Sequence, residues 1–304
     1  MTAQRKRFIM DRRRGKEAAD VKDAKRESIF SCPVCGEALM IGEGVYRCAS
    51  GHCFDRAKEG YVNLLPANRQ HASAPGDDKE MVRARTIFLD SGRYALLKEA
   101  LCTMAERYAG EGTVLLDAGC GEGYYTEGLS RVIEEKGGRT GGADLSKTAV
   151  KKAAKRCREA EIAVASVYHL PLAEGSVDMV TDCFSPLAKE EYRRVLKHGG
   201  RFLYVVPGAR HLWEMKEILY DKPYENEVRE EAYEGFRLLE TVNLNFGFRL
   251  EKAEEIMALF RMTPYTWKTP KEGVDIIDIF ENPLLVSDIV QPGLSQGIGS
   301  NQEA

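Results

Sequence analysis

Five residues able to bind a metal lie close together near the start of the sequence. Cys32 and Cys35 form a C-x2-C pair, and Cys48, His52 and Cys53 follow after a short spacer. Thiolates and imidazole are the ligands that zinc prefers, and closely spaced ligand pairs let a tight turn enclose the ion. Four protein ligands leave no open position for water, so the pattern predicts a structural zinc site rather than a catalytic one. The spacing leaves both His52 and Cys53 open as the fourth ligand.

A disulfide is the competing interpretation of these cysteines. The sequence shows no secretory signal peptide and no apolar run long enough to span a membrane, so we expect a soluble, cytoplasmic protein without membrane contact. Disulfides rarely persist in that reducing compartment, which favours zinc. The other four cysteines have the character of ordinary buried or half-buried thiols. They are Cys102, Cys120, Cys157 and Cys183.

A second candidate site is the glycine-rich turn in "LLDAGCGEGYY", where Gly119, Gly121 and Gly123 form G-x-G-x-G. Glycines there let the backbone turn tightly and approach a ligand. The dinucleotide-binding fingerprint has a glycine where this chain has Tyr124, which disfavours a pyrophosphate ligand. Asp117, just before the turn, suits a cation. We therefore expect S-adenosylmethionine, which carries an ammonium and a sulfonium and no phosphate.

Asp144 follows at the end of the next expected strand, in "GGADLS". A carboxylate at this position can accept hydrogen bonds from both ribose hydroxyls of a nucleoside ligand. The alternative is that Asp144 caps the next helix, although Ser146 could do that instead. Together with the glycine turn, Asp144 favours a cofactor site.

The elements that must position these residues alternate between strand-like and helical patterns from Thr113 onward. Such alternation is typical of βαβ units, so the chain is expected to be α/β with a doubly wound, mostly parallel sheet. The segments, in order, are "TVLLDAG", "YTEGLSRVIEE", "TGGADLS", "KTAVKKAAKRC", "IAVASV", "VDMVTDCF", "KEEYRRVL" and "GRFLYVVP".

Composition bounds the organisation of the chain. Its 304 residues, 43% of them hydrophobic, are enough for one full core with a small appendage. The net charge of -3 gives no chain-wide nucleic-acid signature, but residues 1–16 contain seven Lys or Arg against one acid. This arm either binds phosphates or is a solvated tail. The expected ranges are 1–30 for the basic tail, 31–66 for the zinc module, 67–110 for a linker and helical segment, 111–272 for the cofactor-binding domain and 273–304 for a C-terminal tail.

Two later stretches resemble class I methyltransferases. "HLPLAEGSVDMV" resembles the segment leading into strand four of that class, and "EEYRRVLKHGGRFLYV" resembles its helix, turn and strand five. The resemblance implies a Rossmann-like class I methyltransferase domain that uses S-adenosylmethionine, behind a small N-terminal zinc-ribbon-like domain.

A narrower resemblance covers residues from about 30 to 272. "CPVCGEAL…YRCASGHCFDRAKEGYVNLLP", "PGDDKEMVRARTIFLDSGRY", "DAGCGEGYYT", "PGARHLWEMKEILY" and "FRMTPYTWKTP" resemble, in this order, the 23S ribosomal RNA guanine-N1 methyltransferases. The resemblance implies methyl transfer from S-adenosylmethionine to N1 of a guanine in a hairpin of 23S ribosomal RNA. It implies zinc ligands at Cys32, Cys35, Cys48 and His52. It implies cofactor contacts at Tyr94, Gly121, Glu122 and His211.

The resemblance also implies a division of labour. Guanine N1 lies on the Watson–Crick edge, so the target must be unpaired or extruded, and the zinc module would hold the surrounding RNA. Because the expected cofactor contacts lie in the later sheet and at Tyr94, we expect residues 1–66 to be removable without much loss of cofactor binding. Asp182, in "DCFSP", is a candidate general base or simply a strand-end residue, and no catalytic residue is assigned.

The chain departs from the family pattern at both ends. The arm before residue 30 is not part of the pattern, and after Gly273 the sequence does not match the family's last strand, which "VDIIDIF" either replaces or leaves missing. The competing functions are a methyltransferase for a small-molecule acceptor and a non-catalytic zinc-containing RNA-binding protein. The oligomeric state is open, with a homodimer among the alternatives.

Overall fold

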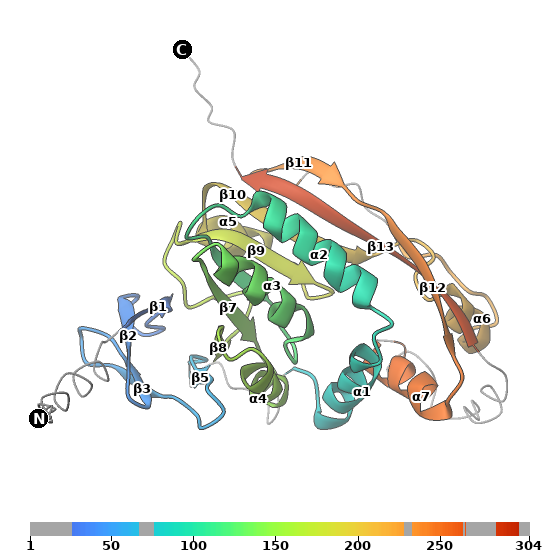
Figure 1. Cartoon of the computed structure of the whole chain (residues 1–304), viewed down its shortest axis with the longest axis horizontal. Coiled ribbons are helices and arrows are strands. Elements are labelled where there is room, and N and C mark those ends of the chain that lie inside the picture. Colours follow the sequence, from blue (N-terminus) through green and yellow to red (C-terminus); the bar gives the residue numbers. More distant parts are fainter. Residues whose placement is uncertain (1–25, 67–75, 228–232, 264, 266–283, 298–304) are drawn as a thin grey trace, which may run out of the picture.

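The computed structural model describes residues 26–66, 76–227, 233–263, 265 and 284–297, the last range as backbone only (Figure 1). The basic arm of residues 1–16 and the "VDIIDIF" segment lie outside these ranges. None of the described helices is both long and apolar enough to cross a membrane.

Two sheets organise the described chain. The first is small and antiparallel, with its strands in sequence order: β1 (Arg26–Ser31), β2 (Ala38–Gly42), β3 (Val45–Arg47) and β4 (Cys53–Asp55). The second has nine strands in the order β11-β13-β10-β9-β6-β7-β8-β5, and β12 pairs with β13. Its strands are β5 (Val62–Asn63), β6 (Val114–Ala118), β7 (Arg139–Asp144), β8 (Glu161–Val164), β9 (Val177–Cys183), β10 (Leu196–Pro207), β11 (Phe236–Thr241), β12 (Leu244–Leu250) and β13 (Leu284–Gly297).

The centre of the large sheet is parallel, from β10 through β9, β6, β7 and β8 to β5. The apolar runs that form these strands are buried on both faces, as parallel strands require. The expected doubly wound, mostly parallel sheet is confirmed.

Seven helices accompany the sheets in the described ranges, and α2 and α3 cover one face of the large sheet (Figure 1). Helix α3 begins at Tyr124, directly after the glycine turn, and Ser146 caps α4 through a hydrogen bond from the amide of Ala149. The helices are α1 (Lys79–Asp90), α2 (Ala95–Tyr108), α3 (Tyr124–Glu135), α4 (Lys147–Arg156), α5 (Lys189–Val195), α6 (Trp213–Leu219) and α7 (Ala253–Met262).

Alternate residues of the central strands face two different cores. Leu115 on β6 belongs to the core that includes α2 and α3. Its neighbour Leu116 belongs to a second core, which includes Tyr192 of α5 and Phe30 and Tyr46 of the zinc module. The period of two along a strand therefore places the zinc module and α5 against the face opposite α2 and α3.

The zinc module is thus part of the main body. Its last strand, β5, extends the large sheet by pairing Val62 with Ala163 of β8, and the amide of Ser31 donates to the carbonyl of Pro171 at 2.7 Å. The module begins at Arg26, inside the range assigned to the tail. The module's apolar residues are part of the core of the sheet, so removing residues 1–66 would uncover that core, and the expectation that cofactor binding survives this removal stays a prediction.

An antiparallel strand does close the far side of the sheet, where the sequence left the last strand open. It is β13, which lies between β10 on one side and β11 and β12 on the other. This strand comes after "VDIIDIF" in the sequence, within the range assigned to the C-terminal tail.

Candidate functional site

The four expected zinc ligands converge. One ligand atom from each of Cys32, Cys35, Cys48 and His52 lies within 4.8 Å of the other three. The Sγ atoms of Cys35 and Cys48 are 3.7 Å apart, and the Cys48 Sγ lies 3.3 Å from Nδ1 of His52. A tetrahedral zinc with ordinary Zn–S bonds separates two sulfurs by about 3.8 Å. The residues therefore fit a zinc ion that has four protein ligands.

Cys53 is the residue left over. Its side chain is exposed, and its Sγ contacts the carbonyl of Gly51 at 3.2 Å instead of joining the cluster. The structure thus favours His52 over Cys53 as the fourth ligand.

Local backbone geometry shapes the two knuckles of the cluster. The amide of Gly36 donates to the carbonyl of Cys32 at 2.8 Å, and Gly36 has a φ of 77°, which a residue with a Cβ rarely adopts. Between the knuckles, the carboxylate of Glu37 accepts from the amide of Ser50 at 2.8 Å. These bonds fix the ligand positions within a very small sheet.

The glycine loop after β6 has little room for side chains. A Cβ at Gly119 would lie 2.0 Å from Oγ of Ser185, and one at Gly123 would lie 2.9 Å from the Cα of Ala153. Gly121, by contrast, would meet only the Arg85 guanidinium, at 3.9 Å. The loop is therefore packed closely against two neighbouring segments and leaves its middle glycine backbone approachable, as a nucleoside cofactor requires.

Asp117, at the end of β6, is buried and has polar partners for both oxygens. Thr181 donates to Oδ1 at 2.8 Å, and Thr126 donates to Oδ2 at 2.6 Å. Burial raises the pKa of Asp117 to about 6, and the two hydroxyl donors oppose that shift. A buried carboxyl group with a raised pKa is stabilised in its charged form by a nearby cation.

Asp144, at the end of β7, faces the same loop. Its Oδ2 accepts from the amide of Gly121 at 3.0 Å, and its Oδ1 accepts from the amide of Ser146 at 2.7 Å. Burial raises the pKa of Asp144, while the two amide donors lower it. Ser146 is the helix cap, so Asp144 is free of that role, and each oxygen keeps a lone pair for a ribose hydroxyl.

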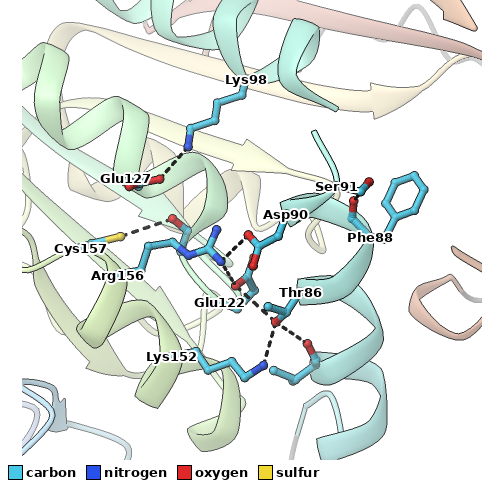
Figure 2. A network of polar contacts seen from close by, with 12 residues as sticks. Thr86, Phe88, Asp90, Ser91, Lys98, Glu122, Glu127, Lys152, Arg156 and Cys157 are labelled. Carbon is cyan, nitrogen blue, oxygen red and sulfur yellow. Dashed lines mark hydrogen bonds and ion pairs between the residues drawn. The ribbon is translucent and has the colours of Figure 1, made fainter. Parts of the chain in front are cut away.

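Glu122 points away from the middle of the loop, toward α1 and α4 (Figure 2). Its Oε2 lies 3.0 Å from Arg156 and 3.4 Å from Thr86, and Arg156 also contacts Asp90 at 2.7 Å. Burial raises the pKa of Glu122, and Arg156 lowers it. The network joins helix α1, the glycine loop and helix α4, so the Glu122 side chain holds the loop in place.

Tyr94 and His211 come together through a third aromatic residue. The ring of Phe184 lies 6.4 Å from that of Tyr94 and 5.7 Å from that of His211, centroid to centroid. Tyr94 is 2% exposed and also packs edge-on against Phe88 and Phe246, so its core-packing role is clear. All seven expected cofactor residues therefore gather around the carboxyl ends of the parallel strands.

Asp182, the candidate base, is buried. Its Oδ2 accepts from the hydroxyl of Tyr192 at 2.8 Å, and its Oδ1 accepts from the amide of Ser185 at 3.0 Å. Burial raises the pKa of Asp182 to about 7. With both oxygens occupied inside the fold, Asp182 shapes the loop after β9.

Sequence reasoning missed three parts of this site. Thr126 and Thr181 hold Asp117, but a single threonine in a helix or strand gives no recognisable signal. Arg156 of helix α4 forms an ion pair with Glu122, and no sequence pattern predicts that pair. Phe184 lies in "DCFSP", a stretch already singled out, where an aromatic residue next to an expected strand end was the available clue.

Two family models match the chain. The model described as "RlmA, N-terminal", a zinc ribbon, matches residues 30–73, and the model described as "Methyltransferase domain" matches residues 116–204. The first range contains the four clustered ligands, and the second contains the glycine loop and Asp144.

Named relatives match larger parts of the chain. A 23S rRNA (guanine(748)-N(1))-methyltransferase from Streptomyces fradiae is 41% identical over 192 residues, which are 62% of this chain and 66% of the relative. Two further relatives have names that begin "Putative 23S rRNA (guanine-N(1)-)-methyltransferase". The relative from Micromonospora griseorubida is 33% identical, and the match covers 78% of this chain and 86% of the relative. The relative from Bacillus subtilis (strain 168) is 29% identical, and the match covers 86% of this chain and 95% of the relative.

The relative from Micromonospora griseorubida is more than 30% identical and is covered over most of its length, and the two family models contain the zinc cluster and the glycine loop. The chain belongs to the 23S rRNA (guanine-N1)-methyltransferase family.

Proposed function

We propose that this chain transfers a methyl group from S-adenosylmethionine to N1 of one guanine in a hairpin of 23S ribosomal RNA. The observation that carries the proposal is the shared core of the zinc module and the cofactor-binding sheet. A rigid body of this kind can hold an RNA fold with one part while another part receives the extruded base. A small-molecule methyltransferase has no need of the first part.

We assign the cofactor contacts as follows. Asp117 faces the cationic end of S-adenosylmethionine, and Gly119 and Gly121 let the backbone approach it. Asp144 accepts the ribose hydroxyls with the lone pairs that its amide partners leave over. Glu122 contributes through its backbone, because its carboxylate is held by Arg156. Tyr94 and His211 border the site beyond the loop.

The zinc ion has a structural role in this proposal. Cys32, Cys35, Cys48 and His52 occupy all four of its positions, so the metal holds the module's fold and takes no part in methyl transfer.

The reaction depends mainly on how the protein positions the acceptor nitrogen and the methyl donor. When bound, S-adenosylmethionine would supply an activated methyl group, which would pass to N1 as the carbon–sulfur bond breaks with its electron pair left on sulfur, and the N1 proton would pass to solvent. The protein must hold N1 in line with the methyl carbon and exclude competing water.

A basic helix face next to the zinc module supports an RNA partner. Helix α4, "KTAVKKAAKR", contains no acidic residue, and Lys147, Lys151 and Lys155 are exposed along one side of it. Lys151 also contacts Glu59 of the module at 3.1 Å. The exposed lysines of this helix, which lies beside the module, suit the phosphates of a folded RNA.

Primer extension on ribosomal RNA tests the reaction directly, because a methyl group on N1 blocks Watson–Crick pairing and stops reverse transcriptase. The proposal predicts one new stop at a guanine, present only with enzyme and cofactor together. Methyl transfer to a small metabolite, with no stop in any ribosomal RNA, would overturn it. RNA binding without turnover would leave only a binding protein.

Calorimetry tests the cofactor assignment separately. S-adenosylmethionine should bind and NAD should not. Asp144→Ala should weaken binding by about 1–3 kcal/mol, the usual cost of losing a buried polar partner. An unchanged affinity in this variant would remove Asp144 from the site.

A further inference from the structure

Two residues other than glycine have a positive φ in the described chain, and both border the same spot. They are Phe184, with a φ of 57°, and Leu212, with a φ of 52°. Side chains with a Cβ rarely adopt this conformation, and it persists where the surroundings enforce it, often at functional sites. Leu212 directly follows His211, whose ring is the neighbour of Phe184. The fold therefore imposes strain on both sides of this pair of rings.

The loop that carries Phe184 is fixed on three sides. The amide of Phe184 donates to the carbonyl of Val205 on β10 at 3.1 Å, and the amide of Ser185 donates to buried Asp182. The Ser185 side chain fills the space where a Cβ on Gly119 would lie. One residue therefore separates Phe184 from direct contact with the cofactor loop.

The Phe184 ring itself is open to solvent on one side. It is 40% exposed, although Tyr94 and His211 pack beside it and Tyr94 is almost fully buried. The strained backbone thus leaves the part of this apolar ring that faces neither Tyr94 nor His211 in contact with water. The arrangement makes sense if a flat partner covers the exposed part of the ring during function.

We propose that the exposed part of Phe184 is the surface on which the target guanine stacks after it leaves the RNA. This inference rests on the proposed function and adds the subsite for the acceptor base. An extruded purine loses its stacking neighbours, and an aromatic side chain replaces them. Because the loop of Phe184 touches the cofactor loop through Ser185 and Gly119, a base stacked there lies beside the methyl donor. Its Watson–Crick edge, which bears N1, stays free to face the methyl group.

The matched pair Phe184→Leu and Phe184→Tyr tests this role in the full-length, zinc-loaded protein. Leucine keeps an apolar side chain under the same backbone strain but has no aromatic face, whereas tyrosine keeps the face. Phe184→Leu should lower kcat/KM for the RNA by about 5- to 150-fold, the range that stacking on one base implies. Its affinity for S-adenosylmethionine should stay within about twofold of wild type. Phe184→Tyr should retain most of the activity.

A spectroscopic readout separates stacking from a purely structural role. The guanine that the wild-type protein methylates is replaced in a hairpin RNA by 2-aminopurine, whose fluorescence rises on extrusion and is quenched by stacking. The complex with Phe184→Leu should be brighter than the complexes with wild type and Phe184→Tyr. Equal fluorescence in all three, or an equal loss of activity in both variants, overturns the inference while the proposed function stands. If the wild type methylates no guanine, the proposed function fails and the inference falls with it.

Discussion

The hydroxyl of Ser28 donates a hydrogen bond of 2.6 Å to Oε2 of Glu161, which joins the first strand of the zinc module to β8 of the large sheet. The same oxygen accepts from the amide of Ile29 at 3.2 Å, and Oε1 accepts from Arg26 at 3.1 Å. Glu161 is 5% exposed, so these partners replace the water that its carboxylate loses on burial. One buried carboxylate thus fastens two parts of the chain that are far apart in sequence.

Replacing this carboxylate should loosen the module. Glu161→Gln keeps the size of the side chain, but its amide NH2 would face the hydrogen-bond donors that the carboxylate accepts from. The substitution should lower the free energy of unfolding by about 2 kcal/mol. Arg26→Ala removes only the partner whose side chain is 57% exposed, and should cost less than about 1 kcal/mol. Urea unfolding of the zinc-loaded proteins measures both. Equal losses in the two variants would contradict the dominant role of Ser28 and Ile29.

The zinc assignment predicts opposite outcomes for two nearby cysteines. Cys48→Ala removes a ligand that is also part of the shared core, and should release the metal and lower the thermal unfolding temperature. Cys53→Ala should keep about one zinc per chain, because its thiol lies outside the cluster. Elemental analysis with thermal unfolding checks both. Metal loss of similar extent in the two proteins would mean that the fourth ligand is misassigned.

Cofactor affinity should depend on pH through Asp117. Burial raises its pKa from 3.8 to about 6, so the folded protein holds this proton more tightly than the unfolded chain does. The contribution of Asp117 protonation to the free energy of unfolding is therefore complete below pH 3.8 and is lost as pH rises through about 6. A cationic ligand favours the ionised form, so binding of S-adenosylmethionine should strengthen about tenfold from pH 5 to pH 7.

Asp117→Asn is the control for this pH effect. Asparagine keeps the shape and can still accept from one threonine, but it cannot ionise, so the affinity profile should flatten between pH 5 and pH 7. Calorimetry in buffers of different ionisation enthalpy measures the proton released on binding. A profile that stays steep in this variant would assign the pH dependence to another group.

The Arg156–Glu122 pair should matter far more than an exposed pair on the neighbouring helix. Arg156→Ala leaves the buried Glu122 carboxylate without its cation, and should cost about 3 kcal/mol of stability and weaken cofactor binding, because α1 and α4 lose their hold on the loop. Arg131→Ala breaks an ion pair with Glu127 in which the arginine is 72% exposed, and should cost less than about 0.5 kcal/mol. Chemical denaturation and calorimetry compare them, and similar effects would refute the structural role given to Glu122.

The sequence predicted the features that depend on local pattern. The glycine turn before α3, the cap at Ser146 and the parallel pairing of the central strands follow from turn residues, capping chemistry and alternation. The metal cluster followed from ligand spacing and a family resemblance. In each case, the deciding residues form a pattern that repeats or closes within a short stretch of the sequence.

The features that sequence reasoning missed depend on contacts across long stretches of chain. The hydrogen bond between Ser28 and Glu161 spans 133 positions, so the sequence near either residue does not predict it. The pairing of β5 with β8 is equally remote, and it turned an expected appendage into part of the sheet. Phe184 was within a stretch already noted, but its exposure and strain follow from packing against Tyr94, Ser185 and His211.

The position of β5 has a consequence for how the chain is made. The zinc module is synthesised before strands β6 to β10, yet β5 pairs with β8, and the module's apolar residues share a core with strands that are synthesised later. Contacts between distant residues form slowly, because a long loop must close before they add stability. We therefore expect a nascent chain ending near residue 110 to bind zinc but to leave Phe30 and Tyr46 uncovered. Limited proteolysis of stalled chains of increasing length should show the module becoming resistant only after residue 172 has emerged. Resistance of the shorter chain would show that the module folds alone. The expected result would show that the module folds fully only after the strands that it packs against have been synthesised.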